Sequence, residues 1–309
     1  MVVSDGDESR ASTGRTAAVN VLARTLIEGI VAQGGTAILL KGASFASALY
    51  DPEEAPRLSV DIDLLVPIGA LEVVASVLGA RGYTASASRS PGDHATTWRR
   101  EGLPDVDVHD TLGGLRAPPE RVWEALRKHR RPLQVAGSSV STLDLPALAL
   151  HVAVHANQHG RAGGRTITDL ERALVRIEEG DWRLAYQLAG ELEGLDAFAS
   201  GLRLIAPGRE LAERLNVPPV GSAVAAVRAE SASAAAGLLA NVSDARGLAG
   251  RLRWVRWAIA PPRAVMRDWY PDQPLAIVYL IRRPLRIIVR SPRAIRELRL
   301  ARRAERVRR

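Results

Sequence analysis

Two aspartates separated by one residue are the clearest chemical feature of this chain. Asp61 and Asp63 stand in the stretch SVDIDLLV, residues 59–66, where the apolar residues between and after them predict a β-strand. Side chains two positions apart project from the same face of a strand, with Cα atoms about 6.6 Å apart. Two such carboxylates repel each other unless a cation lies between them. Because Mg²⁺ prefers carboxylate oxygens and shares them with substrate phosphates, the pair indicates metal-dependent phosphoryl chemistry.

A lysine and a glycine upstream of the strand are candidates for binding phosphate. Lys41 and Gly42 stand between a short apolar run and a helical stretch. Gly42 lets the backbone approach a phosphate, and the start of the following helix offers amide donors. Lys41 is one of two lysines in a chain rich in arginine, which favours a site for a compact ammonium over a surface lysine at a strand end. We expect Lys41, Gly42 and Ser44 to hold phosphates, and Arg57 either to reach the same phosphates or to be an exposed loop residue.

A third carboxylate is expected on a later strand. Residues 104–110 alternate, with Asp105, Asp107 and His109 on one face and two valines on the other. A carboxylate on a neighbouring strand would complete a metal site and could accept the proton of an acceptor hydroxyl. Asp105 and Asp107 both point the required way, and the flanking valines favour Asp107. His109 could contact the nucleotide or acceptor, or could hydrogen bond a nearby carboxylate.

Three histidines and one acid in the second half of the chain are further candidates. His151, His155 and His159 follow one another at intervals of four residues, which places them on one face of a helix. Three histidines could bind zinc, but no carboxylate motif accompanies them. The remaining alternatives are that His155 or His159 faces the substrate, or that these histidines are satisfied interface residues. Asp169 begins another predicted helix, where an acid also serves as a cap.

These side chains require a frame of strands and helices to position them. Apolar alternation predicts strands over residues 36–40, 59–66, 82–87, 95–100 and 104–110. Helical spacing predicts helices over 16–33, 43–50 and 68–80 and, further along the chain, over 119–128, 145–160, 166–179, 181–193, 195–206 and 221–239.

The composition is that of a globular protein with more than one domain. A chain of 309 residues that is 47% hydrophobic can bury a sizeable core, and the absence of cysteine excludes disulfides and thiolate zinc sites. The N-terminus has no apolar run typical of a signal peptide, and the seven apolar residues 275–281 are too few to span a bilayer, so we expect a cytoplasmic protein. The expected parts are a disordered lead-in, a catalytic core, a helical domain and an Arg-rich helical segment, at residues 1–15, 16–118, 119–244 and 245–309.

Positive charge is concentrated at the C-terminus. Residues 251–309 contain 17 arginines and four acids, a balance of +13, whereas the whole chain carries +8 and the remainder therefore −5. Such a segment, with tryptophans and a tyrosine among the arginines, could bind RNA or an acidic membrane surface. The alternative is an amphipathic helix that packs its Leu and Ile stripe on the body of the protein and exposes its arginines.

Several motifs together resemble the uncharacterised nucleotidyltransferase family of the DNA polymerase β superfamily. The resemblance covers about residues 20–200, and the downstream helices contribute His155, His159, Asp169 and Trp182 to it. The motifs of the first half are Leu39-Leu40-Lys41-Gly42, Arg57-x-x-x-Asp61-Ile62-Asp63-Leu64-Leu65-Val66, Gly82-Tyr83 and Asp107-Val108-His109.

The resemblance implies an α+β protein with a polymerase β-like mixed-sheet core followed by a helical domain. It also implies Mg²⁺, or Mn²⁺ in its place, and an NTP, with ATP as the first candidate, as ligands. Asp61 and Asp63 match the metal-binding pair of the superfamily, Asp107 its third carboxylate, and Gly42 its phosphate-side glycine. The chain departs from the superfamily directly after Gly42, where a Gly-Ser pair is usual and this sequence has Ala43-Ser44.

The function expected from the residues and the resemblance is Mg²⁺-dependent transfer of a nucleoside monophosphate from an NTP to an unidentified acceptor, with release of pyrophosphate. Two alternatives accompany this expectation. The acceptor could be RNA or a protein that docks on the basic C-terminal segment. The chain could also be a nucleotide-binding or scaffold protein with a decayed site, as Ala43 suggests.

Overall fold

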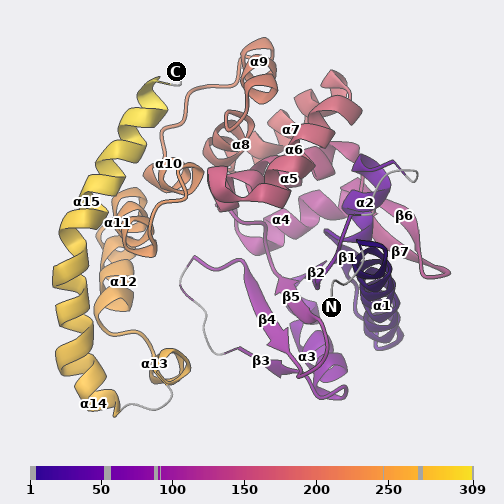
Figure 1. Ribbon diagram of the computed structural model, residues 1–309, viewed down its shortest axis with the longest axis horizontal. Helices are drawn as coiled ribbons and strands as arrows, with labels where there is room; N and C mark the ends of the chain where they lie inside the picture. The colour runs from indigo at the N-terminus through magenta and orange to yellow at the C-terminus, as the bar shows by residue number, and fades with distance from the viewer. Residues whose placement is uncertain are drawn as a thin grey trace. The chain divides into compact units, whose positions relative to one another are not determined.

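The computed structural model describes residues 5–51, 57–86, 90, 92–245, 247–270 and 274–307, and these form two compact units (Figure 1). The first unit comprises Met1–Ser86, His94–His151 and Arg172–Glu193, and the second comprises Ala87–Asp93, Val152–Glu171 and Gly194–Arg309. The units consist of interleaved segments of the chain. The domain boundaries expected at residues 118 and 244 stay predictions.

The first unit is built around a mixed sheet of seven strands in the order β3-β4-β5-β2-β1-β7-β6. The pairs β2–β5 and β1–β7 are parallel and the other neighbours are antiparallel. This sheet and its many helices confirm the expected α+β class. The strands are β1 (Ile38–Leu39), β2 (Asp61–Leu65), β3 (Thr84–Ala85), β4 (Ala95–Arg99), β5 (Asp105–His109), β6 (Arg130–Val135) and β7 (Ser138–Leu143).

The register of β2 against β5 brings the acidic residues together. Asp61 is paired with Asp105, and Asp63 is paired with Asp107. Because side chains alternate between the faces of a sheet, these four carboxylates share one face. The intervening residues, such as Ile62, are buried in a core with apolar side chains of helices α1 (Asp5–Ala32) and α3 (Leu71–Gly79).

The hairpin of β6 and β7 was not predicted from the sequence. Both strands are half polar, RRPLQV and SSVSTL, and lack the apolar run that identified the other strands. Their two-residue connection, Ala136 and Gly137, has positive φ at both positions, 49° and 87°, as tight hairpin turns require. The hairpin adds two strands to the sheet from a stretch for which we predicted no element, within the part expected to be a helical domain.

The remaining helices of the first half follow the predicted pattern with one correction. Helix α1 begins at Asp5, inside the lead-in 1–15 that we expected to be disordered; residues 1–4 lie outside the described residues. The other helices are α2 (Ala43–Leu49), η1 (Ile68–Ala70), α4 (Pro119–Leu126), η2 (Arg127–His129), α5 (Leu145–His159), η3 (Gly160–Ala162), α6 (Gly164–Arg176) and α7 (Glu179–Glu191).

The regular elements of the second unit are helices throughout its described residues. The stretch 221–239, predicted as one helix, forms two, because Ser231 has a positive φ of 51° and Ser233 caps the helix that follows. No described helix is long and apolar enough to cross a bilayer. The elements are α8 (Leu195–Leu202), α9 (Ala206–Arg214), α10 (Ala223–Ala229), α11 (Ala234–Asp244), α12 (Gly247–Ile259), α13 (Arg263–Trp269), α14 (Leu275–Ile277), the π-helical turn η4 (Val278–Arg282) and α15 (Arg283–Val307).

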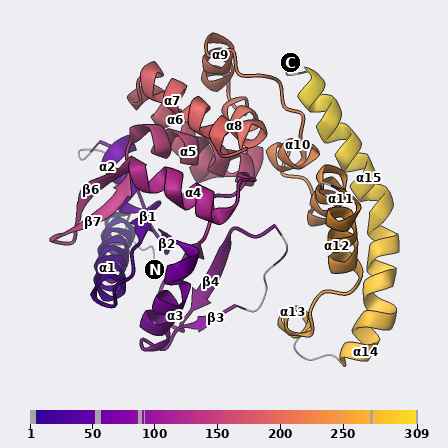
Figure 2. The same cartoon turned by 180° about the vertical axis from the view of Figure 1, so that it is seen from behind.

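Helix α15 packs on its neighbours through small side chains. It runs along α10 and α11 (Figure 2), and its Ala294 and Ala301 are buried in a cluster made mostly of alanines. Several of its larger apolar residues, including Leu285 at 58% and Val289 at 68% exposure, face outward. Leu298 packs against the alanine cluster, so the expected packing of a Leu and Ile stripe is observed in part.

One carboxylate ties α15 to the start of α11. Glu297 accepts a hydrogen bond from the backbone N–H of Ser233 (3.0 Å) and another from Arg293 Nε (2.8 Å). The hydrogen bonding of Ser233, and then that of Arg293, lowers the pKa of Glu297 to about 2. The carboxylate thus satisfies an amide at the first turn of α11, where negative charge is favourable.

We predict that Glu297→Gln loosens the start of α11 in a pH-dependent way. The folded-state pKa lies below that of the unfolded chain, so the ionised group stabilises the fold above about pH 4.5 and loses this effect toward pH 2. At neutral pH the variant should lose about 1–2 kcal/mol locally, seen as faster hydrogen exchange of the α11 N-terminal amides than in the wild type. Glu210→Gln, an exposed change on α9, is the control, and an equal effect of both variants would contradict the assignment.

Candidate functional site

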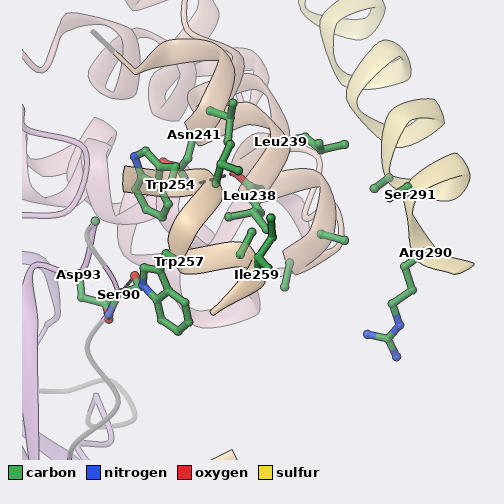
Figure 3. A pocket seen from close by; sticks show the side chains of 18 of the residues that line it. Ser90, Asp93, Leu238, Leu239, Asn241, Trp254, Trp257, Ile259, Arg290 and Ser291 are labelled. Atoms are coloured by element: carbon green, nitrogen blue, oxygen red, sulfur yellow. Dashed lines mark hydrogen bonds between the residues drawn. The ribbon is translucent and has the colours of Figure 1, made fainter. Parts of the chain in front are cut away.

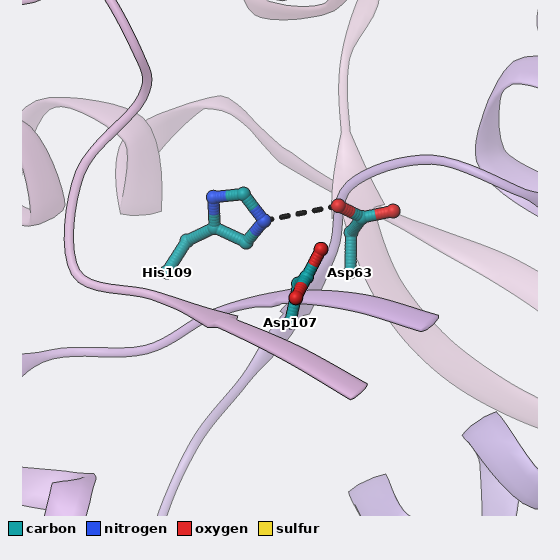
Figure 4. Close-up of side chains that lie close together, drawn as sticks. All are labelled: Asp63, Asp107 and His109. Atoms are coloured by element: carbon teal, nitrogen blue, oxygen red, sulfur yellow. Dashed lines mark hydrogen bonds and ion pairs between the residues drawn. The ribbon is translucent and has the colours of Figure 1, made fainter. Parts of the chain in front are cut away.

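Asp63, Asp107 and His109 form the one group of three described residues whose side chains could together hold a metal ion (Figure 4). One ligand atom from each lies within 4.8 Å of those from the other two. Asp63 is buried on β2, and Asp107 and His109 stand two residues apart on the adjoining strand β5. The parallel pairing of these strands creates the group.

Asp63 is held as a carboxylate by two basic side chains. Its Oδ1 accepts hydrogen bonds from Lys41 Nζ at 2.6 Å and from His109 Nε2 at 3.0 Å. Burial by itself would raise the pKa of Asp63, but the charge of Lys41 and the hydrogen bond from His109 outweigh it and lower the pKa well below its usual range. Asp63 is therefore ionised at any physiological pH.

The second oxygen of Asp63 is the atom best suited to a cation. Asp63 Oδ2 is buried and has no hydrogen-bond partner among the residues that the structure describes. A buried acceptor left unpaired costs roughly 1–3 kcal/mol, and more when it is charged. A divalent cation would satisfy this oxygen, so the residues present fit the metal that the acidic pair implies.

Asp107, rather than Asp105, lies with Asp63 and His109 in this group. Thr97 Oγ1 donates a hydrogen bond to Asp107 Oδ1 at 2.6 Å and fixes the orientation of that carboxylate. The Asp105 side chain is 45% exposed and forms an ion pair with Arg99 at 3.3 Å. The geometry thus favours Asp107 among the two alternatives left open by the sequence.

Asp61 lies on the same face but outside the group of three. It is half-buried at the start of β2, and burial, followed by the negative charges of Asp63 and Asp107, raises its pKa, while Lys41 opposes the shift. The carboxyl is therefore electrostatically linked to the group. A nearby cation would favour the ionised form of this carboxyl and so oppose the rise in its pKa.

The residues expected to hold phosphate occupy different environments. Gly42 has φ 61° and ψ −117°, and a Cβ there would lie 2.9 Å from Ser59 Oγ, so this turn requires glycine. Lys41 reaches Asp63, as described above. Ser44 is fully buried and its hydroxyl is hydrogen bonded to Thr142 on β7, so it faces the sheet.

Arg57 is not the exposed loop residue that one alternative described. It is buried, with its guanidinium 5.2 Å from the ring centroid of Phe45. Residues 52–56, which precede it, lie outside the described residues. Arg57 is thus buried and precedes the strand of Asp61, and its contact with a nucleotide is a proposal.

Two histidines near the group were not predicted as site residues. His94 lies beside His109, with ring centroids 5.2 Å apart. His151 packs edge-on against Phe45, and burial, together with the charge of Lys41, keeps its pKa well below the usual value. His94 belongs to no spacing pattern in the sequence. His151 belongs to the series with His155 and His159, of which only the latter two are expected to face a substrate.

His155, His159 and Asp169 belong to the second unit and are described within it. The rings of His155 and His159 meet edge to face with centroids 4.6 Å apart. His155 and Asp169 are buried, and His159 is exposed. Their contact with a substrate stays a prediction.

Comparison with known proteins finds a matching family and solved structures of low similarity. The model of a family described as uncharacterised nucleotidyltransferase matches residues 7–207. Among solved structures, the chain is similar to the antibiotic-resistance factor ANT(2″)-Ia, at 16% identity and a TM-score of 0.41, covering 56% of this chain and 94% of that one. It is also similar to an antigenic nucleotidyltransferase-like protein from Paracoccidioides brasiliensis, at 17% identity and a TM-score of 0.40, covering 69% and 97%. No curated protein matches the chain.

We predict that replacing His151 removes part of the acid sensitivity of the fold. The folded protein keeps His151 neutral well below pH 6.5, whereas the unfolded chain takes up a proton there, so stability falls as the pH drops below 6.5, by at most about 1.4 kcal/mol per pH unit. His151→Phe should flatten this slope in urea unfolding while keeping the ring contact with Phe45. A His151 NMR signal that titrates near pH 6.5 would contradict the prediction.

We also predict that Gly42→Ala is destabilising for two separable reasons. The backbone angles are unfavourable for an L-residue, at about 1–3 kcal/mol, and the new Cβ would meet Ser59 Oγ at 2.9 Å. Gly102→Ala, at φ 74° with nothing within 4 Å, is a control that places an alanine at positive φ without a close contact. The double variant Gly42→Ala/Ser59→Ala should recover part of the loss in urea unfolding, and no recovery would rule out the contact.

Proposed function

We propose, since this chain belongs to the uncharacterised nucleotidyltransferase family, that it transfers a nucleoside monophosphate from an NTP to an acceptor hydroxyl with Mg²⁺. The acceptor oxygen would form a bond to the α-phosphorus, and the bond to the β-phosphate would break, releasing pyrophosphate. The observation that carries the proposal is the buried Asp63 opposite Asp107, with one Asp63 oxygen lacking a hydrogen-bond partner among the described residues.

Asp61, Asp63 and Asp107 would hold the cation. Two or three carboxylate oxygens suit Mg²⁺, which completes its shell with water and phosphate oxygens, and Mn²⁺ accepts the same ligands. When bound, the cation neutralises phosphate charge and stabilises the negative charge that develops on the departing oxygen. His109 would act as an orienting residue, because its Nε2 already donates to Asp63.

The other side chains of the first unit would position the nucleotide and the proton. Asp107, oriented by Thr97, would accept the proton of the acceptor hydroxyl as the new bond forms. Lys41 has a flexible stem and would turn its ammonium to the phosphates, and Gly42 would let the backbone approach them. Arg57 is retained as a further nucleotide contact, whereas the burial of Ser44 argues against a contact from that hydroxyl.

ATP is the first NTP to test, and a cytoplasmic location is proposed with it. The acceptor is left open, because RNA, a protein and a small molecule all offer the hydroxyl that the reaction requires. Incubation of the full chain with α-labelled ATP and Mg²⁺ in cell extract, followed by mass spectrometry of the labelled product, identifies the acceptor class. Nucleotide binding without labelling of any acceptor would favour the alternative of a decayed nucleotide-binding or scaffold protein.

We predict that the carboxylates differ sharply in their effect on transfer. Asp63→Asn and Asp107→Asn should each reduce pyrophosphate release at least about 100-fold, since each removes charge at the site of phosphoryl transfer. Both should also weaken Mg²⁺-dependent ATP binding in isothermal titration. Asp105→Asn, an isosteric change on the same strand, should stay close to wild type.

The control variant also decides the assignment of the third carboxylate. An inactive Asp105→Asn beside an active Asp107→Asn would show that the wrong acid was chosen. Full activity of Asp63→Asn would overturn the metal site altogether. Circular dichroism of each variant separates these outcomes from a loss of fold.

A further inference from the structure

Helix α12 presents a row of large apolar side chains to the exterior of the second unit. Leu248, Leu252, Val255 and Ile259 are 77%, 65%, 37% and 55% exposed. Their spacing of four, three and four residues confines them to about 60° of the helix circumference. Single exposed apolar residues are ordinary, but a contiguous row marks an interaction surface.

Arginines border this apolar row on both sides. At 100° per residue, Arg251 and Arg256 lie about 40° beyond its two edges, and both are exposed. The opposite side of α12 carries Trp254 and Trp257, which line a cavity of about 930 Å³ (Figure 3). Around the circumference of α12, the half-buried Trp254 and the buried Trp257 are therefore followed by arginines and then by the exposed aliphatic row.

The apolar surface continues beyond the row. Val255 and Ile259 also line the cavity, whose other walls are largely apolar residues of α11 such as Leu238. A second set of exposed apolar residues follows at every fourth position through α14, η4 and α15. These residues are Ile277, Ile281, Leu285 and Val289, which are 47%, 60%, 58% and 68% exposed. Arg290 and Arg293 follow this set and are exposed.

We propose that the aliphatic row of α12 and the arginines beside it dock the protein on an anionic lipid bilayer. The partner must be negatively charged, because residues 251–309 carry 17 arginines against four acids. It must also accept exposed aliphatic side chains. RNA offers the charge without an aliphatic phase, and it is recognised by stacking on aromatic rings, whereas the aromatics of α12 face the cavity.

An anionic bilayer satisfies both requirements at once. Its acyl boundary takes up an aliphatic row to a depth of about 5–10 Å, while flanking arginines remain at the headgroups. A bilayer also needs no matching groove, which suits side chains exposed along a single helix. This docking would be peripheral and does not depend on the transfer of a nucleotide.

The test is flotation of the full chain with vesicles of one part phosphatidylglycerol to two parts phosphatidylcholine. The wild type should float with these vesicles and not with pure phosphatidylcholine. Leu248→Ser/Leu252→Ser should weaken binding at least about tenfold, because the row is then interrupted by hydroxyls. Arg251→Gln/Arg256→Gln should weaken it about 25-fold, since each arginine near an anionic surface contributes about fivefold.

Two matched controls separate the surface from a general effect of composition. Val175→Ser replaces an aliphatic residue that is 86% exposed on α6, and Arg165→Gln removes an exposed arginine outside the C-terminal segment. Both should float like the wild type. The four substituted positions of α12 are exposed, and circular dichroism should show an unchanged helix content.

Three results would overturn the proposal. The first is a wild type that does not float with anionic vesicles. The second is a Leu248→Ser/Leu252→Ser variant that floats as well as the wild type, because charge alone would then explain binding. The third is a wild-type dimer in light scattering that this variant converts to a monomer without any vesicle binding, which would assign the row to a second copy of the chain.

Discussion

The parallel pairing of β2 with β5 is the constraint on which the first unit depends. It places Asp63 opposite Asp107 on one face and their apolar neighbours in the core with α1 and α3 on the other. A slip of one residue would turn the carboxylates into that core and expose the apolar side chains. Since an uncompensated buried carboxylate costs several kcal/mol, the hydrophobic core and the acidic group select the same register.

The second unit distributes its apolar residues in the opposite way. Alanines such as Ala294 and Ala301 form the contact between α15 and its neighbours, while Leu285 and Val289 stay outside. Small side chains let helices approach closely but bury little area, and apolar burial contributes only about 25 cal/mol per Å². The unit thus gives up internal stability that its larger aliphatic residues could supply and keeps their surface available for association.

The sequence predicted the elements that carry strong local patterns. Alternation around Asp61, Asp63 and Asp107 placed β2 and β5 correctly, and the acids on one face followed from the two-residue period. The hairpin 130–143 was missed because its half-polar strands acquire their order from pairing with β1, which is a long-range contact. His94 could not be found, since its proximity to the group arises from the tertiary fold and no spacing reports it.

The bond between Lys41 and Asp63 has a consequence for how the protein exists before it meets its ligands. With Lys41 Nζ 2.6 Å from Oδ1 and His109 on the same oxygen, the buried Asp63 has a built-in counter-ion. This counter-ion belongs to the protein itself, unlike that of small domains whose structure collapses when a chelator removes their ion. Lys41 thus occupies the position of a positive charge beside Asp63, and under the proposed function a cation and an NTP would meet a site whose carboxylate is already ordered.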